Sequence, residues 1–152
     1  MDFVWKEVDK QDEGAVVDLL CSEDVRFATP DVVFYDFCQC WQKELREDFF
    51  VRSIYLDGVF VAAIVFSRSV DAVYTILEFA VVPRFREQRL GSRIVGEFIS
   101  CSSSILGEKI LDAVAVIEWD NYRAQGVFES AGFVNSGTHP DGDACYFRYK
   151  KT

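Results

Sequence analysis

Four arginines are gathered within ten residues, Arg84 to Arg93, of a chain whose formal net charge is -9. They follow an apolar run that ends at Pro83, and from Leu90 onward the apolar spacing is that of a helix. A helix N-terminus offers free backbone N–H groups and a positive dipole, and arginine suits bidentate contacts with phosphate. The pattern therefore predicts a site for a phosphate-bearing ligand, although a solvated arginine-rich loop would have the same composition.

Two segments of the chain have motif-like spacings of glycine, proline and aromatic residues. The first is Val81-Val82-Pro83 followed by Arg86-Glu87-Gln88-Arg89-Leu90-Gly91, and the second, from Asn121 to Phe133, reads N-x-x-A-x-x-V-F-E-x-x-G-F. They resemble the V-x-P, R/Q-x-x-G-x-G/A and N-x-x-A-x-x-L-Y-E-x-x-G-F motifs of the GNAT superfamily of N-acetyltransferases. The chain departs from these motifs with Arg89 at the first glycine and Phe128 at the tyrosine. If position 89 needs a positive φ angle, its arginine is strained by about 1–2 kcal/mol, and otherwise the cost vanishes.

The resemblance implies that acetyl-coenzyme A (acetyl-CoA) is the acetyl donor. The acceptor would be a primary amine, on a small molecule or on a protein lysine or N-terminus. Backbone amides of the arginine-rich turn would meet the cofactor's pyrophosphate, and an N–H group at the end of the preceding strand would stabilise charge on the thioester oxygen. The implied cofactor-binding residues are Phe79, Ala80, Val81, Arg86, Gln88, Arg89, Leu90, Gly91, Ser92, Asn121 and Phe128.

A general base must deprotonate the amine, and Glu78 is the first candidate. Strand alternation would place it on one face with Ile76 and Ala80. Burial in an apolar strand makes a carboxylate a stronger base, which suits proton abstraction. A structural ion pair between Glu78 and a basic residue such as Arg52 is the alternative. Glu118, near the end of a later strand, is the second candidate, and either carboxylate would act directly or through water.

A proton donor for the departing thiolate is harder to find in the sequence. Many members of the family use the tyrosine that is replaced here by Phe128, and a phenyl ring donates no proton. Tyr122 lies on another side of the expected helix, and Tyr146 and Cys145 on the last strand are better explained as core or edge residues. Alternatively no acid is used, because a thiol has a reference pKa of about 8.5 and its thiolate is a tolerable leaving group.

The elements expected from the sequence place these residues in a single domain, 1–152, of the α/β (α+β) class. The GNAT fold implied by the resemblance is a mixed sheet of six to seven strands flanked by four helices. Asp57-Gly58 between two apolar runs predicts a hairpin. The expected strands are 3–8, 49–56, 59–67, 72–82, 109–119 and two within 133–150, and the expected helices are 9–22, 30–47, 90–106 and 121–131. The strand at 109–119 is apolar on both alternating faces, which is typical of a central parallel strand covered on both sides.

Composition excludes several other classes of protein. The five cysteines form no C-x-x-C pair and there is one histidine, so no metal site is expected. The sequence pI of about 4.6 opposes nucleic-acid binding. The longest apolar run, 59–66, is too short to cross a membrane, and the acidic start is unlike a signal peptide, so a cytoplasmic protein is expected.

A non-enzyme is the alternative function that the sequence leaves open. Arg89 and Phe128 favour a domain that has lost efficient catalysis and acts by binding a partner protein.

The aromatic and acidic residues between 23 and 41 would border the acceptor site, but such charges are also typical of an ordinary solvent-exposed surface. The oligomeric state stays open, with a homodimer as one alternative.

Overall fold

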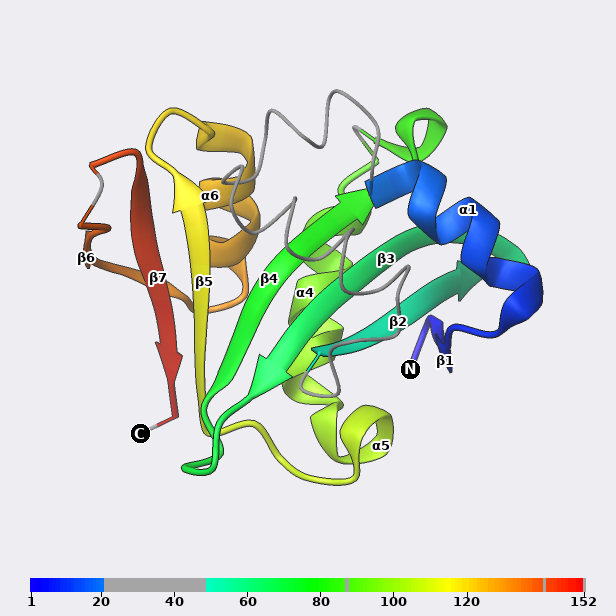
Figure 1. Ribbon diagram of the computed structural model, residues 1–152, viewed down its shortest axis with the longest axis horizontal. Helices are drawn as coiled ribbons and strands as arrows, with labels where there is room; N and C mark the ends of the chain where they lie inside the picture. The colour runs from blue at the N-terminus through cyan, green and yellow to red at the C-terminus, as the bar shows by residue number, and fades with distance from the viewer. Residues whose placement is uncertain (21–48, 87, 141, 152) are drawn as a thin grey trace.

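A seven-stranded sheet forms the centre of the computed structural model, which describes residues 1–20, 49–86, 88–140 and 142–151. The order across the sheet is β1-β2-β3-β4-β5-β7-β6. Described neighbours are antiparallel except for β4 and β5, which run parallel (Figure 1). The strands are β1 (Val4–Glu7), β2 (Phe49–Leu56), β3 (Val59–Arg68), β4 (Tyr74–Val81), β5 (Asp112–Glu118), β6 (Val134–Thr138) and β7 (Ala144–Lys150).

The β2–β3 hairpin confirms the turn expected at Asp57-Gly58. Both residues have positive φ angles, 51° and 79°. Two such residues match the twist of the flanking strands, and aspartate and glycine tolerate that conformation. The hairpin sets the register of β3, against which β4 pairs.

Helices cover both faces of the sheet (Figure 1). On one face α1 (Lys10–Leu20) packs Val16, Leu19 and Leu20 onto residues of β3 and β4, whereas Ala15 is exposed. The carboxylate of Asp9 caps α1 by accepting hydrogen bonds from the next turn. The other face carries α4 (Leu90–Ser100), α5 (Ser102–Leu106) and α6 (Tyr122–Ser130). No helix in the described ranges is long and apolar enough to cross a membrane.

The helix expected over 90–106 is interrupted at Cys101. Ser102 Oγ donates to the carbonyl of Ile99 at 3.1 Å and accepts from the amide of Ile110 at 2.8 Å. Serine side chains that bond nearby backbone groups compete with helical hydrogen bonds, which accounts for the break. The chain therefore turns into α5 instead of continuing along the axis of α4.

The strand expected at 109–119 is an interior strand that runs parallel to β4, as expected, but its bounds and its second neighbour differ from the expectation. The strand begins at Asp112, and it is antiparallel to β7 along its whole length. Its burial alternates, with Ala113, Ala115 and Ile117 buried and the residues between them half-buried. The helix expected over 30–47 lies outside the described residues.

Candidate cofactor-binding and active site

The parallel strands β4 and β5 separate after a short contact. They pair only from Tyr74 to Ile76, opposite Ala113 to Ala115, although both continue in the same direction beyond that point. Figure 1 shows them diverging toward their C-terminal ends. A hollow of about 800 Å³ opens there, lined by β4, β5, the turn after β4 and the helices α4 and α6. The separation leaves the edge of β4 that faces this hollow without a strand partner on β5.

An irregularity in β4 changes which face Glu78 occupies. Val65 of β3 pairs with Glu78 while the next residue, Phe66, pairs with Ile76, so Leu77 is an extra residue in β4. Cross-strand partners share a face, so Ile76 lies with Phe66 toward α4 and Glu78 lies with Val65 toward α1. The expectation that Ile76 and Glu78 share a face was therefore wrong, because simple alternation does not continue through a bulge.

Glu78 is a buried carboxylate at the wall of the hollow. Its residue is 2% exposed, and it precedes Phe79, Ala80 and Val81, which line the hollow beside it. The suggested ion pair between Glu78 and Arg52 is not formed, because Arg52 lies on the opposite face and pairs with Glu7 at 3.7 Å.

The turn after β4 ends in a helix start that is left open. A 3₁₀ turn, η1 (Pro83–Phe85), leads into it, and Arg86 Nε donates to the carbonyl of Val81 at 2.9 Å. Arg89 is the N-cap of α4, and within the described residues no side chain caps this helix and no acidic residue occupies its first turn. The first backbone N–H groups of a helix have no partner inside it. Those of the residues after Arg89 are therefore available to an anion.

Arg89 adopts the left-handed conformation, with φ 58° and ψ 19°. The sequence motif has glycine at this position, and the structure shows why, since non-glycine residues are strained there. Position 89 therefore has the positive φ angle that strains an arginine, and the alternative of an unstrained backbone there does not apply. Gly91 has a different role: a Cβ atom there would lie 3.3 Å from Val127 Cγ2, so the glycine permits the close approach of α4 to α6.

Helix α6 forms the wall opposite the turn. Asn121 caps it, with Oδ1 accepting from the amide of Ala124 at 3.1 Å. Phe128 is 4% exposed and meets Phe133 edge to face, with ring centroids 5.1 Å apart. Phe128 is part of the lining, so the wall presents a phenyl ring where the family motif has a phenol.

Most residues predicted for the site are gathered around this hollow. The predicted residues in its described lining are Glu78, Phe79, Ala80, Val81, Arg86, Arg89, Leu90, Gly91, Ser92, Asn121 and Phe128. Gln88 and Glu118 are absent from that lining. Gln88 is exposed on the turn, and Glu118 is half-buried at the end of β5, where its carbonyl accepts from Gln125 Nε2 at 3.1 Å.

Sequence reasoning missed Arg123 and Ser130, which also line the hollow. Both occupy variable positions of the second motif, so the motif carried no signal for them, and only the positive charge of Arg123 near Asn121 pointed to the site. Tyr146 is outside the described lining, with its ring 5.5 Å from that of His139. Within the described ranges no group of three or more His, Cys, Asp or Glu side chains is placed to hold a metal ion.

Solved structures of known proteins have the same fold as this chain. The spermidine N-acetyltransferase from Vibrio cholerae, solved with CoA and spermine, superposes with a TM-score of 0.77 at 10% identity over 97% of this chain and 95% of that one. AAC(6')-Ib, solved with ribostamycin and coenzyme A, gives 0.77 at 14% identity over 99% and 94%. No protein of curated function matches the sequence. A sequence profile described as the acetyltransferase (GNAT) family matches residues 14–133, and the chain belongs to that family.

Proposed function

We propose that this protein is an N-acetyltransferase that transfers the acetyl group of acetyl-CoA to a primary amine of a small molecule or a protein. The observation that carries the proposal is that one hollow joins an open helix start, three arginines and a buried carboxylate. Family membership supports the reaction class. The structural neighbours were solved with CoA and either spermine or ribostamycin, which supports the same pair of substrates here.

The residues of the hollow fit the phosphate groups of acetyl-CoA. The amides of Leu90, Gly91 and Ser92 stand at the positive end of α4, and Arg86 and Arg89 add two guanidinium groups to the lining. The volume of about 800 Å³ lies within the usual range for small-molecule sites. When bound, acetyl-CoA supplies the acetyl group as a thioester that an amine can attack.

The chain's own groups would perform two tasks in the transfer. Glu78, directly or through a water molecule, would accept the proton that the ammonium acceptor must lose before it can act as a nucleophile. A backbone N–H on the edge of β4 that β5 has left would donate to the oxygen on which negative charge develops. We prefer Glu78 to Glu118 as the base because Glu78 lines the hollow and Glu118 is outside its described lining.

Calorimetric titration with acetyl-CoA, followed by release of free CoA in the presence of a panel of primary amines, tests the proposal. Wild-type protein should bind acetyl-CoA and release CoA with at least one amine. Glu78→Gln should retain cofactor affinity within about twofold and lose at least about 100-fold in turnover, the contribution of a general base. Glu118→Gln is the matched control and should retain turnover within a few fold. Absence of acetyl-CoA binding by the wild type would sink the proposal.

A second candidate function is favoured by one observation, the phenyl ring of Phe128 in the wall of the hollow. A domain that binds the cofactor but transfers no acetyl group would act through a partner protein instead. Cofactor binding without CoA release for any amine in the panel is the result expected from that function. Affinity capture with the folded protein would then be used to find the partner.

A further inference from the structure

A second hollow, of about 350 Å³, lies between α5 and the strands β2, β3 and β4. We refer to it as the α5 hollow, and its described lining is Phe50, Arg52, Phe66, Arg68, Tyr74, Leu106 and Glu108. It shares no described lining residue with the cofactor hollow. It adjoins the first residue of β4, whereas the cofactor hollow begins at Ile76 and follows β4 to its C-terminal end. The α5 hollow is therefore a separate place on the molecule.

Arg52 is an unusual residue at the wall of the α5 hollow. It alternates along β2 with Phe50 and Ile54, on the face that packs against α4, and Ile54 is completely buried. The Arg52 side chain is only 15% exposed. A position that would ordinarily hold an apolar side chain thus holds a guanidinium group, and burial of a charge is costly unless it is paired.

The described residues satisfy little of the hydrogen-bonding capacity of Arg52. One nitrogen, Nη1, donates to the carbonyl of Val51 at 3.0 Å. The other, Nη2, lies 3.7 Å from Oε1 of Glu7, whose side chain is 86% exposed, and this distance is too long for a hydrogen bond. The guanidinium carbon lies 5.7 Å from the centroid of the Phe66 ring. Because a guanidinium has five N–H donors, an anion in the hollow would find donors at Arg52.

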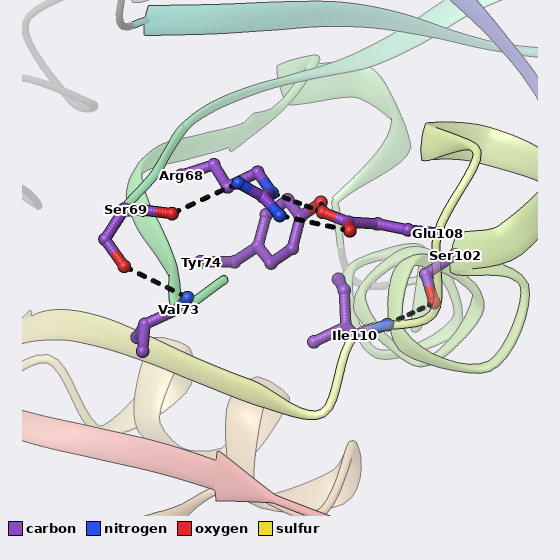
Figure 2. A network of polar contacts seen from close by, with 7 residues as sticks. All are labelled: Arg68, Ser69, Val73, Tyr74, Ser102, Glu108 and Ile110. Carbon is purple, nitrogen blue, oxygen red and sulfur yellow. Dashed lines mark hydrogen bonds and ion pairs between the residues drawn. The ribbon is translucent and has the colours of Figure 1, made fainter. Parts of the chain in front are cut away.

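The other charged groups of the α5 hollow neutralise each other. Figure 2 shows Arg68 and Glu108 facing one another, with Tyr74 beside them. Arg68 binds both carboxylate oxygens of Glu108, and the hydroxyl of Tyr74 donates to the same carboxylate. These contacts, that of Arg68 first, lower the pKa of Glu108, so it remains ionised at neutral pH and matches the charge of Arg68. Arg52, whose ion pair with the exposed carboxylate of Glu7 is long at 3.7 Å, is the remaining cation of the lining.

Aromatic rings form the rest of the wall. Phe50 and Phe66 are stacked, with centroids 5.5 Å apart and planes at 17°. The ring centroids of Phe66 and Tyr74 lie 6.1 Å apart. Phe66 and Tyr74 are almost fully buried, whereas Phe50 is 39% exposed, so Phe50 is the ring against which a flat apolar group can pack.

We propose that the α5 hollow binds a small organic carboxylate with a flat apolar body, whose carboxylate group pairs with Arg52 and whose body lies against the exposed ring of Phe50. A guanidinium matches the two oxygens of a carboxylate, and the aromatic wall selects against small anions that lack an apolar part. The proposal is independent of acetyl transfer, because none of its residues line the cofactor hollow.

Benzoate is the probe for the first test, with benzamide as its neutral analogue and acetate as the anion without a ring. Titrations of ¹⁵N-labelled full-length protein should show saturable benzoate shifts at Phe50, Arg52 and Phe66. Benzamide and acetate should each bind at least about tenfold more weakly, since one removes the charge and the other the apolar contact. Saturating acetyl-CoA should leave the benzoate affinity unchanged.

Arg52→Gln is the variant that tests the role of the guanidinium, and it should weaken benzoate binding at least about tenfold. Arg84→Gln is the matched control, because Arg84 also lies over a phenyl ring, that of Phe85 at 4.7 Å, but outside the α5 hollow. If Arg52→Gln does not fold, the comparison of benzoate with benzamide on the wild type decides the question. The proposal is overturned if benzoate causes no saturable shift in the wild-type protein below about 10 mM, or if benzamide binds as tightly as benzoate. It is also overturned if acetyl-CoA displaces benzoate, or if folded Arg52→Gln binds benzoate with unchanged affinity.

Discussion

Replacement of Arg89 by glycine should raise the stability of the protein and lower its affinity for acetyl-CoA. Arg89 has φ 58° and ψ 19°, a conformation that costs a residue with a Cβ atom about 1–2 kcal/mol. Glycine relieves this strain but also gains about 0.4–1 kcal/mol of entropy in the unfolded chain. The net gain in the free energy of unfolding is therefore about 1 kcal/mol, which for a domain of this size raises Tm by about 2–4 °C.

The effect on the cofactor should have the opposite sign. Arg89 is an exposed residue in the lining of the cofactor hollow, so under the proposed function its guanidinium contacts a phosphate group in partial contact with solvent. Exposed ion pairs contribute about 0.2–1 kcal/mol, so Arg89→Gly should weaken acetyl-CoA binding by up to about fivefold. Strain that persists at a binding residue because the residue is useful is a known feature of functional sites.

Differential scanning calorimetry and titration calorimetry on the same preparations measure the two effects. Ala72→Gly is the matched control, because Ala72 has φ 60° in the turn between β3 and β4 and lies outside the described lining of the cofactor hollow. Ala72→Gly should show a similar rise in Tm and an unchanged affinity for acetyl-CoA. A lower Tm in Arg89→Gly alone would refute the strain argument, and an unchanged affinity would remove Arg89 from the cofactor site.

Two further predictions concern ionisable groups away from the hollows. The residue Glu97 in α4 is 9% exposed, and its carboxylate accepts hydrogen bonds from Trp5 Nε1 at 2.8 Å and from two backbone amides of the N-terminal segment. Glu97→Gln should therefore lower the free energy of unfolding, measured in urea, by about 1–3 kcal/mol. It should also shift the tryptophan fluorescence. The Arg148 guanidinium lowers the pKa of Asp112, so this pair stabilises the fold above the unfolded pKa of about 3.9 and ceases to do so as the pH falls through the lower folded value. Unfolding measured between neutral and strongly acidic pH should therefore show a weaker loss on acidification in Asp112→Asn than in the wild type, and an identical acid profile would contradict the assignment.

Local features of the chain allowed much of the fold to be predicted. The Asp57-Gly58 turn, the strand–turn–helix segment around Pro83 and the short helix expected over 121–131 depend on residues within one or two turns of each other. Such features are determined by backbone preferences that the sequence displays directly. The apolar spacing of α4 likewise predicted the burial of its core-facing residues.

The position of Glu78 could not be predicted in the same way. Its face depends on the extra residue Leu77, and a bulge arises from pairing with β3 on one side and divergence from β5 on the other. The local alternation of apolar residues along β4 does not reveal how either β3 or β5 pairs with it. The same limit applies to Glu118, which ends β5 and which the fold leaves outside the described lining.

The buried position of Arg52 shows the limit most clearly. In the sequence it is one polar residue between Phe50 and Ile54 at alternate positions of a strand, and this local pattern gives no sign of a hollow beside it. The hollow beside its side chain is also bounded by Leu106 of α5 and by Glu108, which are distant in the chain, and α5 exists because the long helix is interrupted at Cys101. The surroundings of Arg52 become apparent only when these residues have been placed.

Phe128→Tyr tests whether the missing phenol limits the proposed reaction. The Phe128 ring is 4% exposed but belongs to the wall of the cofactor hollow, so we expect the added hydroxyl to reach the hollow, with a change in stability below about 1 kcal/mol. There it would offer a proton to the departing thiolate. Because a thiolate is already a tolerable leaving group, turnover should rise by about tenfold or less, with unchanged affinity for acetyl-CoA. A loss of about 1–3 kcal/mol without faster turnover would show instead that the hydroxyl is buried against Phe133 without a hydrogen-bond partner.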